Sequence, residues 1–332
     1  MFIAIEGTDA SGKSSLCDEI ARQLSETDRP PMRMHKGRPA EESRLWALNE
    51  YAISLETMNF AASNVVSDRW HWGEVTYAPL KRPHTCVNDE FGLLGVAGWR
   101  WVELFMASRA MTQFWLYQPL EVIQKRLAGR GDDFVSVDEL SVILDLYSKA
   151  AESACSVLLI NPSSDSQSEI PDLARKFISV AEQKTVEVSR IAGYKQYIGK
   201  PNPKALLVGD KRNGKTYTIL PFMPINSNSG EYLMTALTEE TWRDVGIVNS
   251  EDVPGKKLRD LWHALGTPTI VSLGREAEKR IVESGIPSSA VRTLPHPQYV
   301  KRFHHNDKNE YGMAISRIIN NTISEDDEWL LQ

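Results

Sequence analysis

Residues 2–15 read Phe-Ile-Ala-Ile-Glu-Gly-Thr-Asp-Ala-Ser-Gly-Lys-Ser-Ser, an apolar run followed by a loop framed by glycines. Beyond the loop, Leu16, Ile20 and Leu24 recur at the spacing of one helix face. The predicted order is therefore strand, loop, helix. Glycines in such a loop let backbone N–H groups point at phosphate oxygens, and the helix N-terminus adds partial positive charge. The stretch predicts a phosphate-binding loop, or P-loop.

The P-loop motif predicts which part of the nucleotide each of its residues contacts. Lys13 is expected to bridge the β- and γ-phosphates of ATP, and Ser14 to hold Mg²⁺. The full set of expected nucleotide-binding residues is Gly7, Thr8, Asp9, Ala10, Ser11, Gly12, Lys13, Ser14 and Ser15. Such loops also occur in switches and motors, so residues elsewhere in the chain must decide what this loop does.

Further apolar runs at residues 64–67, 113–117 and 156–161 alternate with helical stretches. This alternation predicts an α/β fold with a parallel sheet flanked by helices. Turn-forming residues at 198–203 interrupt the pattern. A second series of apolar runs follows, at residues 205–209, 246–249, 269–274 and 291–295.

A length of 332 residues favours two domains. We expect a P-loop nucleotide kinase domain at residues 1–189, a second, smaller α/β domain at 190–324 and an acidic tail at 325–332. No apolar run is long enough to span a membrane, and the N-terminus lacks the layout of a signal peptide. A cytoplasmic protein without a membrane partner is expected, and its three scattered cysteines support neither disulfides nor a zinc site.

Two segments indicate catalysis. Asp68-Arg69 follows a predicted strand, which places a carboxylate and a guanidinium at the carboxyl edge of the sheet, beside the P-loop. Asp68 can reach the Mg²⁺, and Arg69 can bind a second phosphate.

Residues 120–134 read as a helix that runs into a Gly/Asp loop, with Arg126 and Arg130 four residues apart. Closing over the triphosphate, these arginines can stabilise the charge that develops during transfer. The candidate catalytic residues are Lys13, Asp68, Arg126 and Arg130.

These motifs resemble the thymidylate kinase family of nucleoside monophosphate kinases. Residues 6–15 resemble its Glu-Gly-x-Asp-Gly-x-Gly-Lys-Ser-Thr loop, Asp68-Arg69-Trp70 resembles its Asp-Arg-Tyr motif, and Arg126-x-x-x-Arg130 resembles its lid. The resemblance covers about residues 1–185. It implies that ATP and Mg²⁺ are used to phosphorylate a deoxynucleoside monophosphate such as dTMP, and that the chain could form a homodimer.

By the same resemblance, Asp9 would contact the sugar hydroxyl or support the acceptor phosphate, which Arg69 would bind. The acceptor pocket would be walled by Trp70, His71, Trp72, Glu74 and Tyr77, where aromatic faces can stack on a base. Each of these aromatic residues could instead belong to the core. Arg38, in the segment His35–Pro39, belongs either to an acceptor-binding loop or to a solvated turn. The family's arginine-containing helix that reads thymine has no counterpart here, which leaves the base open.

Five short motifs follow one another in the second half: Leu207-Val208-Gly209-Asp210, Asn228-Ser229-Gly230-Glu231-Tyr232-Leu233, Val248-Asn249, residues 271–277 and Leu294-Pro295-His296-Pro297-Gln298. In order and spacing, over about residues 203–303, they resemble the motifs of the uracil-DNA glycosylase superfamily. The candidate site residues of this half are Asp210, Asn249 and His296; the latter two would contact a base, and Lys211, Arg212, Lys301 and Arg302 would contact DNA phosphates. Residues 210–213 lack the family's proline-containing loop. We therefore expect a catalytically silent domain that recognises a base or binds DNA. A structural or dimerising domain is the second option, and an active glycosylase is the third.

Three functions follow in order of preference. The first is a kinase that converts a deoxynucleoside monophosphate, dTMP-like, to the diphosphate. The second is a kinase that phosphorylates a hydroxymethyl pyrimidine within DNA, which the second domain would recognise. The third is a non-enzymatic P-loop sensor or DNA-binding switch, against which the arginine-rich lid argues.

Overall fold

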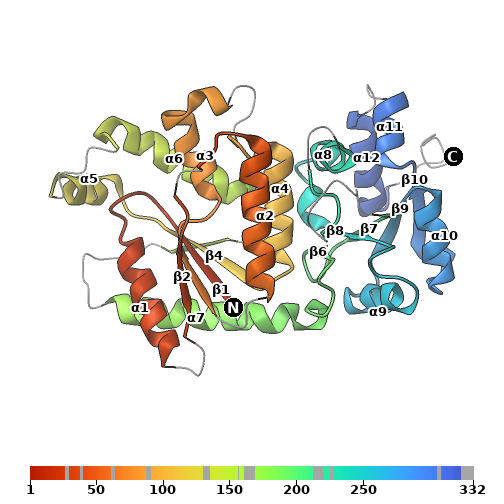
Figure 1. The fold of residues 1–332 in the computed structure, drawn as a ribbon, viewed down its shortest axis with the longest axis horizontal. Helices are drawn as coiled ribbons and strands as arrows, with labels where there is room; N and C mark the ends of the chain where they lie inside the picture. The colour runs from red at the N-terminus through yellow and green to blue at the C-terminus, as the bar shows by residue number, and fades with distance from the viewer. Residues whose placement is uncertain are drawn as a thin grey trace. The chain divides into compact units, whose positions relative to one another are not determined.

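The computed structural model describes residues 1–26, 30–37, 40–60, 64–86, 91–129, 135–155, 157–160, 169–211, 220–224, 228–304 and 308–322. The chain separates into two compact units (Figure 1). Unit 1 comprises Met1–Gly95 and Ala110–Val186, and unit 2 comprises Val96–Arg109 and Glu187–Gln332. The expected acidic tail at 325–332 lies outside the described residues.

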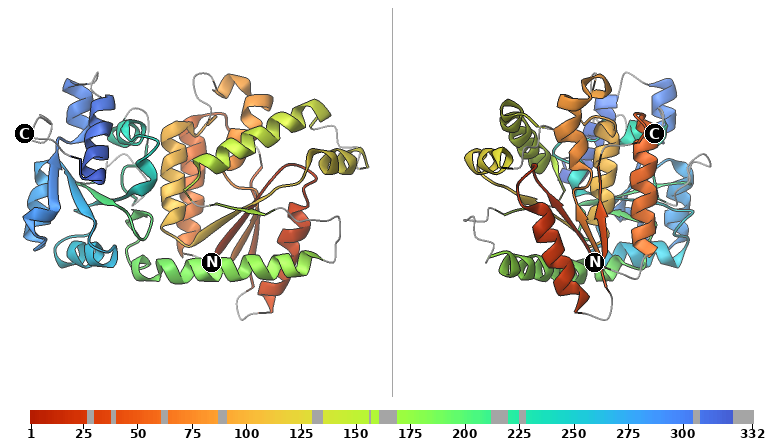
Figure 2. Two further views of the ribbon diagram at one scale, coloured as in Figure 1. Left: turned by 180° about the vertical axis from the view of Figure 1, so that it is seen from behind. Right: turned by 60° about the vertical axis from the view of Figure 1, so that its left-hand side comes forward.

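Unit 1 is built on a parallel sheet of five strands in the order β2-β3-β1-β4-β5. The strands are β1 (Phe2–Glu6), β2 (Met32–His35), β3 (Val65–Asp68), β4 (Met111–Leu116) and β5 (Val157–Ile160). Its helices are α1 (Lys13–Ser25), α2 (Arg44–Phe60), α3 (Trp72–Lys81), α5 (Leu120–Ala128), α6 (Val137–Ser153) and α7 (Ile170–Val188). The predicted α/β fold with a flanked parallel sheet is confirmed (Figure 2).

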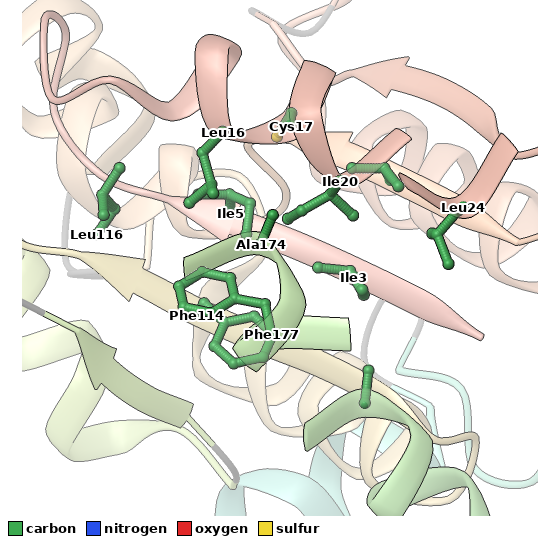
Figure 3. Close-up of a cluster of buried hydrophobic side chains, with 12 residues drawn as sticks. Ile3, Ile5, Leu16, Cys17, Ile20, Leu24, Phe114, Leu116, Ala174 and Phe177 are labelled. Atoms are coloured by element: carbon green, nitrogen blue, oxygen red, sulfur yellow. The ribbon is translucent and has the colours of Figure 1, made fainter. Parts of the chain in front are cut away.

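The core of unit 1 explains how the loop after β1 is held. Leu16 and Ile20 on α1 are buried against Ile3 and Ile5 of β1, in one cluster with residues of β4 and α7 (Figure 3). Within the cluster, the rings of Phe114 and Phe177 stack with centroids 4.0 Å apart. The periodicity seen in the sequence therefore anchors α1 on the sheet, and both ends of the P-loop are fixed by buried apolar side chains.

Unit 2 has its own five-stranded sheet, in the order β10-β9-β7-β8-β6, parallel except for the antiparallel pair β6–β8. The strands are β6 (Ile198–Gly199), β7 (Ala205–Gly209), β8 (Val245–Asn249), β9 (Thr269–Leu273) and β10 (Val291–Leu294). The helices are α4 (Gly95–Ala107), α8 (Ser229–Ala236), α9 (Lys256–Ala264), α10 (Arg275–Glu283), α11 (Pro297–Phe303) and α12 (Lys308–Asn320). A second α/β unit is thus present.

The sequence predicted a single domain boundary near residue 190, and the position of helix α4 does not agree with it. Although α4 precedes β4 in the chain, it belongs to unit 2. Arg100 donates to the carbonyls of Met234 and Leu237, both at 2.7 Å, and forms an ion pair with Glu239. These polar contacts join α4 to the end of α8, a partnership that apolar periodicity does not reveal. No helix in the described ranges is long and apolar enough to cross a membrane.

Candidate functional site

The loop between β1 and α1 has the backbone of a tight anion cradle. Gly7 and Gly12 have φ angles of 152° and 98°, and a Cβ on Gly7 would lie 2.8 Å from the carbonyl oxygen of Leu116. Ala10 also adopts a left-handed conformation, with φ of 58°, which costs a residue with a Cβ about 1–2 kcal/mol. Strain of this kind is typical of a backbone held in place for a ligand.

Several polar groups of this loop are buried in a way that suits phosphate. The hydroxyls of Thr8 and Ser11 are buried and find no hydrogen-bond partner within the described ranges. Lys13 is 5% exposed, and its Nζ donates to the carbonyl of Thr8 at 2.5 Å. Burial, together with the charge of Arg69, lowers the pKa of Lys13 to about 8. Phosphate oxygens would supply acceptors to the hydroxyls and a counter-charge to the lysine.

Ser14 and Asp68 meet as expected from the sheet order. Because β3 pairs with β1, Asp68 lies opposite Ile5, and the Ser14 hydroxyl donates to Asp68 Oδ2 at 2.5 Å. The other carboxylate oxygen, Oδ1, is buried without a hydrogen-bond partner in the described part of the chain. A hydroxyl and a carboxylate are oxygen ligands of the kind that Mg²⁺ prefers, so the residues fit the ion.

Across the described ranges, no group of three or more His, Cys, Asp or Glu side chains could hold a metal ion. An ion at Ser14 and Asp68 would therefore depend on phosphate oxygens and water for its other ligands, which is the usual situation of Mg²⁺ in nucleotide sites.

Arg69 joins the P-loop to a second group of residues. It forms an ion pair with Asp9 and donates to the Tyr77 hydroxyl at 3.3 Å, while Tyr77 donates to Asp9 Oδ2 at 3.0 Å. The guanidinium also lies over the Tyr77 ring, 4.7 Å from its centroid. With φ of 66°, Arg69 is a second left-handed residue at this edge of the sheet. The expected acceptor residues Asp9, Arg69 and Tyr77 are thus brought together.

Glu6 supports this turn and was not predicted as a site residue. Its fully buried carboxylate accepts hydrogen bonds from the backbone N–H groups of Trp70 at 2.8 Å and Trp72 at 3.3 Å. Burial raises the pKa of Glu6, and His71 and the backbone bonds oppose the rise. The carboxylate therefore ties the end of β1 to the residues on either side of His71 and fixes the turn that carries Arg69.

A pocket of about 80 Å³ opens beside Arg69. Aromatic rings and cationic side chains dominate its lining, which comprises Lys36, Gly37, Tyr51, Arg69, Trp70, Gly73, Glu74, Tyr77, Lys81 and Arg82. All four cations have carboxylate partners: Arg69 with Asp9, Lys36 with Glu50 at 2.7 Å, Lys81 with Glu139 at 2.8 Å, and Arg82 with Glu74 at 2.9 Å. Such a pocket can hold a planar ring near an anionic group.

The expected aromatic residues divide between pocket and core. Trp70 and Tyr77 line the pocket, as proposed from the sequence. His71 is fully buried, lies edge-on to the Tyr51 ring at 6.3 Å, and is not part of the lining. Tyr51 does line the pocket but was not predicted, since nothing in the spacing of α2 distinguishes it from a core residue.

Arg126 reaches the P-loop from α5. Its Nη1 donates to the carbonyls of Ala10 at 3.2 Å and Ser11 at 3.3 Å. A guanidinium at the rim of the anion cradle is what the expected lid role requires. The other expected lid arginine, Arg130, and the expected acceptor residue Arg38 lie outside the described residues.

In unit 2 the three expected site residues stand at the carboxyl edge of the sheet: Asp210 follows β7, Asn249 ends β8 and His296 follows β10. Asn249 is 2% exposed, and Arg280 lies 3.4 Å from Asp210. Burial lowers the pKa of His296, whose Nδ1 accepts a hydrogen bond from the backbone of Gln298 at 3.1 Å. The imidazole is thus favoured in its neutral form.

Phe222 completes this second cluster and was not predicted from the sequence. A Cβ on Gly209 would lie 2.5 Å from its ring and 2.8 Å from Asn249 Oδ1. The ring centroids of Phe222 and His296 are 6.4 Å apart. Gly209 therefore allows an aromatic ring, an amide and an imidazole to gather at one place. Of the expected phosphate contacts, Lys211 is exposed, Lys301 and Arg302 lie on α11, and Arg212 lies outside the described residues.

No protein-family model and no curated protein matches the chain. Similar solved structures include YorR protein from Bacillus subtilis in complex with phosphorylated GDP, at 19% identity and a TM-score of 0.44, covering 56% of this chain and 98% of that chain. Deoxyadenosine kinase from M. mycoides, with products dCMP and dCDP bound, has 14% identity, a TM-score of 0.36 and coverages of 54% and 100%.

Shikimate kinase from Acinetobacter baumannii, in complex with shikimate, has 16% identity, a TM-score of 0.33 and coverages of 56% and 94%. Identities and TM-scores this low leave the function to be derived from the residues themselves.

Proposed function

We propose that this chain transfers the γ-phosphoryl group of ATP to a deoxynucleoside monophosphate, dTMP-like, and gives the diphosphate. The observation that carries the proposal is the juxtaposition of two sites at one sheet edge. Ser14 and Asp68 mark the donor side, and Arg69, next to Asp68 in the chain, lines the aromatic and cationic pocket on the acceptor side.

On the donor side, the P-loop backbone and Lys13 would hold the triphosphate, and Ser14 and Asp68 would hold Mg²⁺. The ion, when bound, would neutralise charge on the phosphate oxygens. Lys13 would exchange its hydrogen bond to Thr8 for one to phosphate. Arg126 already contacts the carbonyls of Ala10 and Ser11, from where it can stabilise the charge of the transferring group.

On the acceptor side, Arg69 would bind the acceptor phosphate, and Tyr51, Trp70 and Tyr77 would enclose the base. An oxygen of the acceptor phosphate then forms the new bond to the γ-phosphorus, and the bond from that phosphorus to the β–γ bridging oxygen breaks, releasing ADP. A phosphate acceptor is already ionised, so this transfer needs no general base. Positioning and charge stabilisation supply the catalysis.

Incubating the full-length protein with labelled ATP, Mg²⁺ and the deoxynucleoside monophosphates tests the proposal. Asp68→Asn should reduce transfer strongly, whereas Asp18→Asn, a substitution at an exposed carboxylate on α1 that pairs with Arg33, should not. Folded protein that binds ATP but transfers nothing to any of these nucleotides would refute the proposal and leave the DNA-directed kinase and the sensor as candidates.

The Phe222, Asn249 and His296 cluster favours one second candidate: a kinase that phosphorylates a hydroxymethyl pyrimidine in DNA, with unit 2 recognising the base. A hydroxyl acceptor must lose a proton, and the carboxylate that we assign to accept it is Asp9, which pairs with Arg69 of the pocket lining and accepts a hydrogen bond from Tyr77. Labelled phosphate should then pass to duplex DNA that contains the modified base. Asn249→Ala should impair that transfer and leave free nucleotides unaffected; failure with every modified DNA rules this candidate out.

A further inference from the structure

A tyrosine of α6 holds the first peptide of the P-loop. The Tyr147 hydroxyl donates to the Gly7 carbonyl at 2.8 Å, a buried contact between residues 140 positions apart in the chain. The Tyr147 ring is fully buried and stacks on the Trp115 indole, with centroids 6.2 Å apart and an angle of 16° between the rings. The Trp72 indole packs against it as well, with a centroid distance of 6.2 Å. Close packing therefore holds the hydroxyl in one place.

The Gly7 carbonyl needs such a donor because it is buried and its peptide has no room to turn. Gly7 has a φ of 152°, and a Cβ at this position would lie 2.8 Å from the Leu116 carbonyl oxygen. A buried carbonyl left without a hydrogen bond is strongly disfavoured. Tyr147 supplies the donor from a helix outside the loop, so the sequence of the loop alone does not reveal it.

Lys13 runs alongside the same stretch of backbone. A Cβ on Gly7 would lie 3.5 Å from Lys13 Cδ, and the Lys13 ammonium donates to the carbonyl of the next residue, Thr8, at 2.5 Å. An ammonium has three donors and no acceptor. If the Gly7 carbonyl lost the Tyr147 hydroxyl, the buried cation beside it would be drawn to it, and a second donor of Lys13 would be bound within the loop.

We infer that Tyr147 is a positioning residue of the donor site: by occupying the Gly7 carbonyl, it keeps the donors of Lys13 available to the β- and γ-phosphates of ATP. Its fully buried side chain acts through Lys13 and not by contact with the nucleotide. The inference rests on one part of the proposed function, the binding of ATP at the P-loop, and it does not depend on the acceptor.

The test measures the Kd values of Mg²⁺–ATP and Mg²⁺–ADP by calorimetry on the full-length protein. Tyr147→Phe keeps the ring and removes the donor. Lys13 is expected to contact two phosphates of ATP but one of ADP. At about 3-fold for each hydrogen bond, the Kd should therefore rise about 10-fold for ATP and about 3-fold for ADP. The preference for ATP over ADP should narrow accordingly.

Tyr197→Phe is the matched control. Tyr197 is also fully buried, and its hydroxyl donates to a backbone carbonyl, that of Lys200, at 2.6 Å. This substitution removes the same kind of hydrogen bond, so it should lower the thermal unfolding temperature and leave both Kd values unchanged.

A double-mutant cycle tests whether Tyr147 acts through Lys13. In a Lys13→Met background, Tyr147→Phe should leave the Kd for ATP unchanged within about 2-fold, whereas a general role in loop structure gives the same loss in both backgrounds. Incorporation of 4-aminophenylalanine at position 147 returns a donor to the same place and should restore the preference for ATP. This variant also decides the question if Tyr147→Phe does not fold.

Equal weakening of ATP and ADP in Tyr147→Phe, unchanged Kd values for both, or equal losses in the two Lys13 backgrounds would overturn the inference. If ATP binding responds as expected but no nucleotide is phosphorylated, the proposed function fails and the inference stands. A protein that binds neither ATP nor ADP would contradict both.

Discussion

Binding of Mg²⁺–ATP should draw a proton onto Lys13. In the free protein the pKa of this lysine lies at about 8, below its ordinary value of 10.5, because the side chain is buried and Arg69 is near. A bound triphosphate surrounds the Nζ with anionic oxygens, which favour the charged form and raise its pKa again. Binding is therefore coupled to proton uptake wherever free Lys13 is partly neutral.

The size of the uptake follows from the lowered pKa. With a pKa of about 8, the neutral fraction, and so the uptake per ATP, is about 0.1 proton at pH 7, about 0.5 at pH 8 and about 0.9 at pH 9. The apparent Kd for Mg²⁺–ATP should rise by a factor of about 10 between pH 7 and pH 9, because a growing share of the protein must first bind a proton.

Titration calorimetry in two buffers of different ionisation enthalpy measures this uptake directly at each pH. Lys13→Arg provides the control, since its guanidinium stays protonated throughout and its binding should show almost no uptake. An uptake near zero at pH 9 in the unaltered protein, or an equal uptake in Lys13→Arg, would refute the assignment. Without ATP, the pKa of Lys13 is about 8 in the folded protein and 10.5 in the unfolded chain. Between these two values the unfolded chain binds more protons than the folded protein, so the contribution of Lys13 to the free energy of unfolding rises with pH there.

Three further predictions concern the backbone and the lid. Ala10→Val should lower the free energy of unfolding by at least about 1 kcal/mol and weaken ATP binding, because a β-branched residue tolerates φ of 58° poorly. The control Ala10→Gly should stay within about 1 kcal/mol of the unaltered protein, and chemical denaturation measures both variants. Gly312→Ala would place a methyl group 1.8 Å from the Ala236 carbonyl oxygen and should lower the free energy of unfolding in urea by about 1–3 kcal/mol. The control Met313→Ala, at an exposed neighbouring residue, should not lower it to this extent. Arg126→Gln should reduce kcat about 10²- to 10³-fold with a smaller change in the Kd for ATP, and equal losses in both would show that Arg126 only binds ground-state nucleotide.

Sequence patterns predicted the donor side well because local rules determine it. The helical spacing of Leu16 and Ile20 places α1 on β1, and parallel strands end at the same sheet edge, so the sequence alone predicts Asp68 beside Ser14. Both contacts are present.

The acceptor pocket was harder to predict because distant segments assemble it. Tyr51 comes from α2 and Arg82 from the residue after α3, and their meeting depends on tertiary packing that no periodicity records. His71 illustrates the converse: an aromatic neighbour of Arg69 looked equally suited to the pocket, but its side chain is buried against Tyr51. Only the neighbouring Trp70 lines the pocket.

The membership of α4 in unit 2 bears on how this gene can change. Trp101 and Phe105 of α4 are fully buried, and the Trp101 indole donates to the Pro221 carbonyl at 3.0 Å. A truncation after residue 189 would uncover these rings and leave Arg100 without its partners, so the shortened product should aggregate. The segments of the two units therefore alternate along the coding sequence. A single recombination event near residue 190 would separate α4 from the rest of unit 2, so it can neither remove one complete unit nor transfer it to another gene.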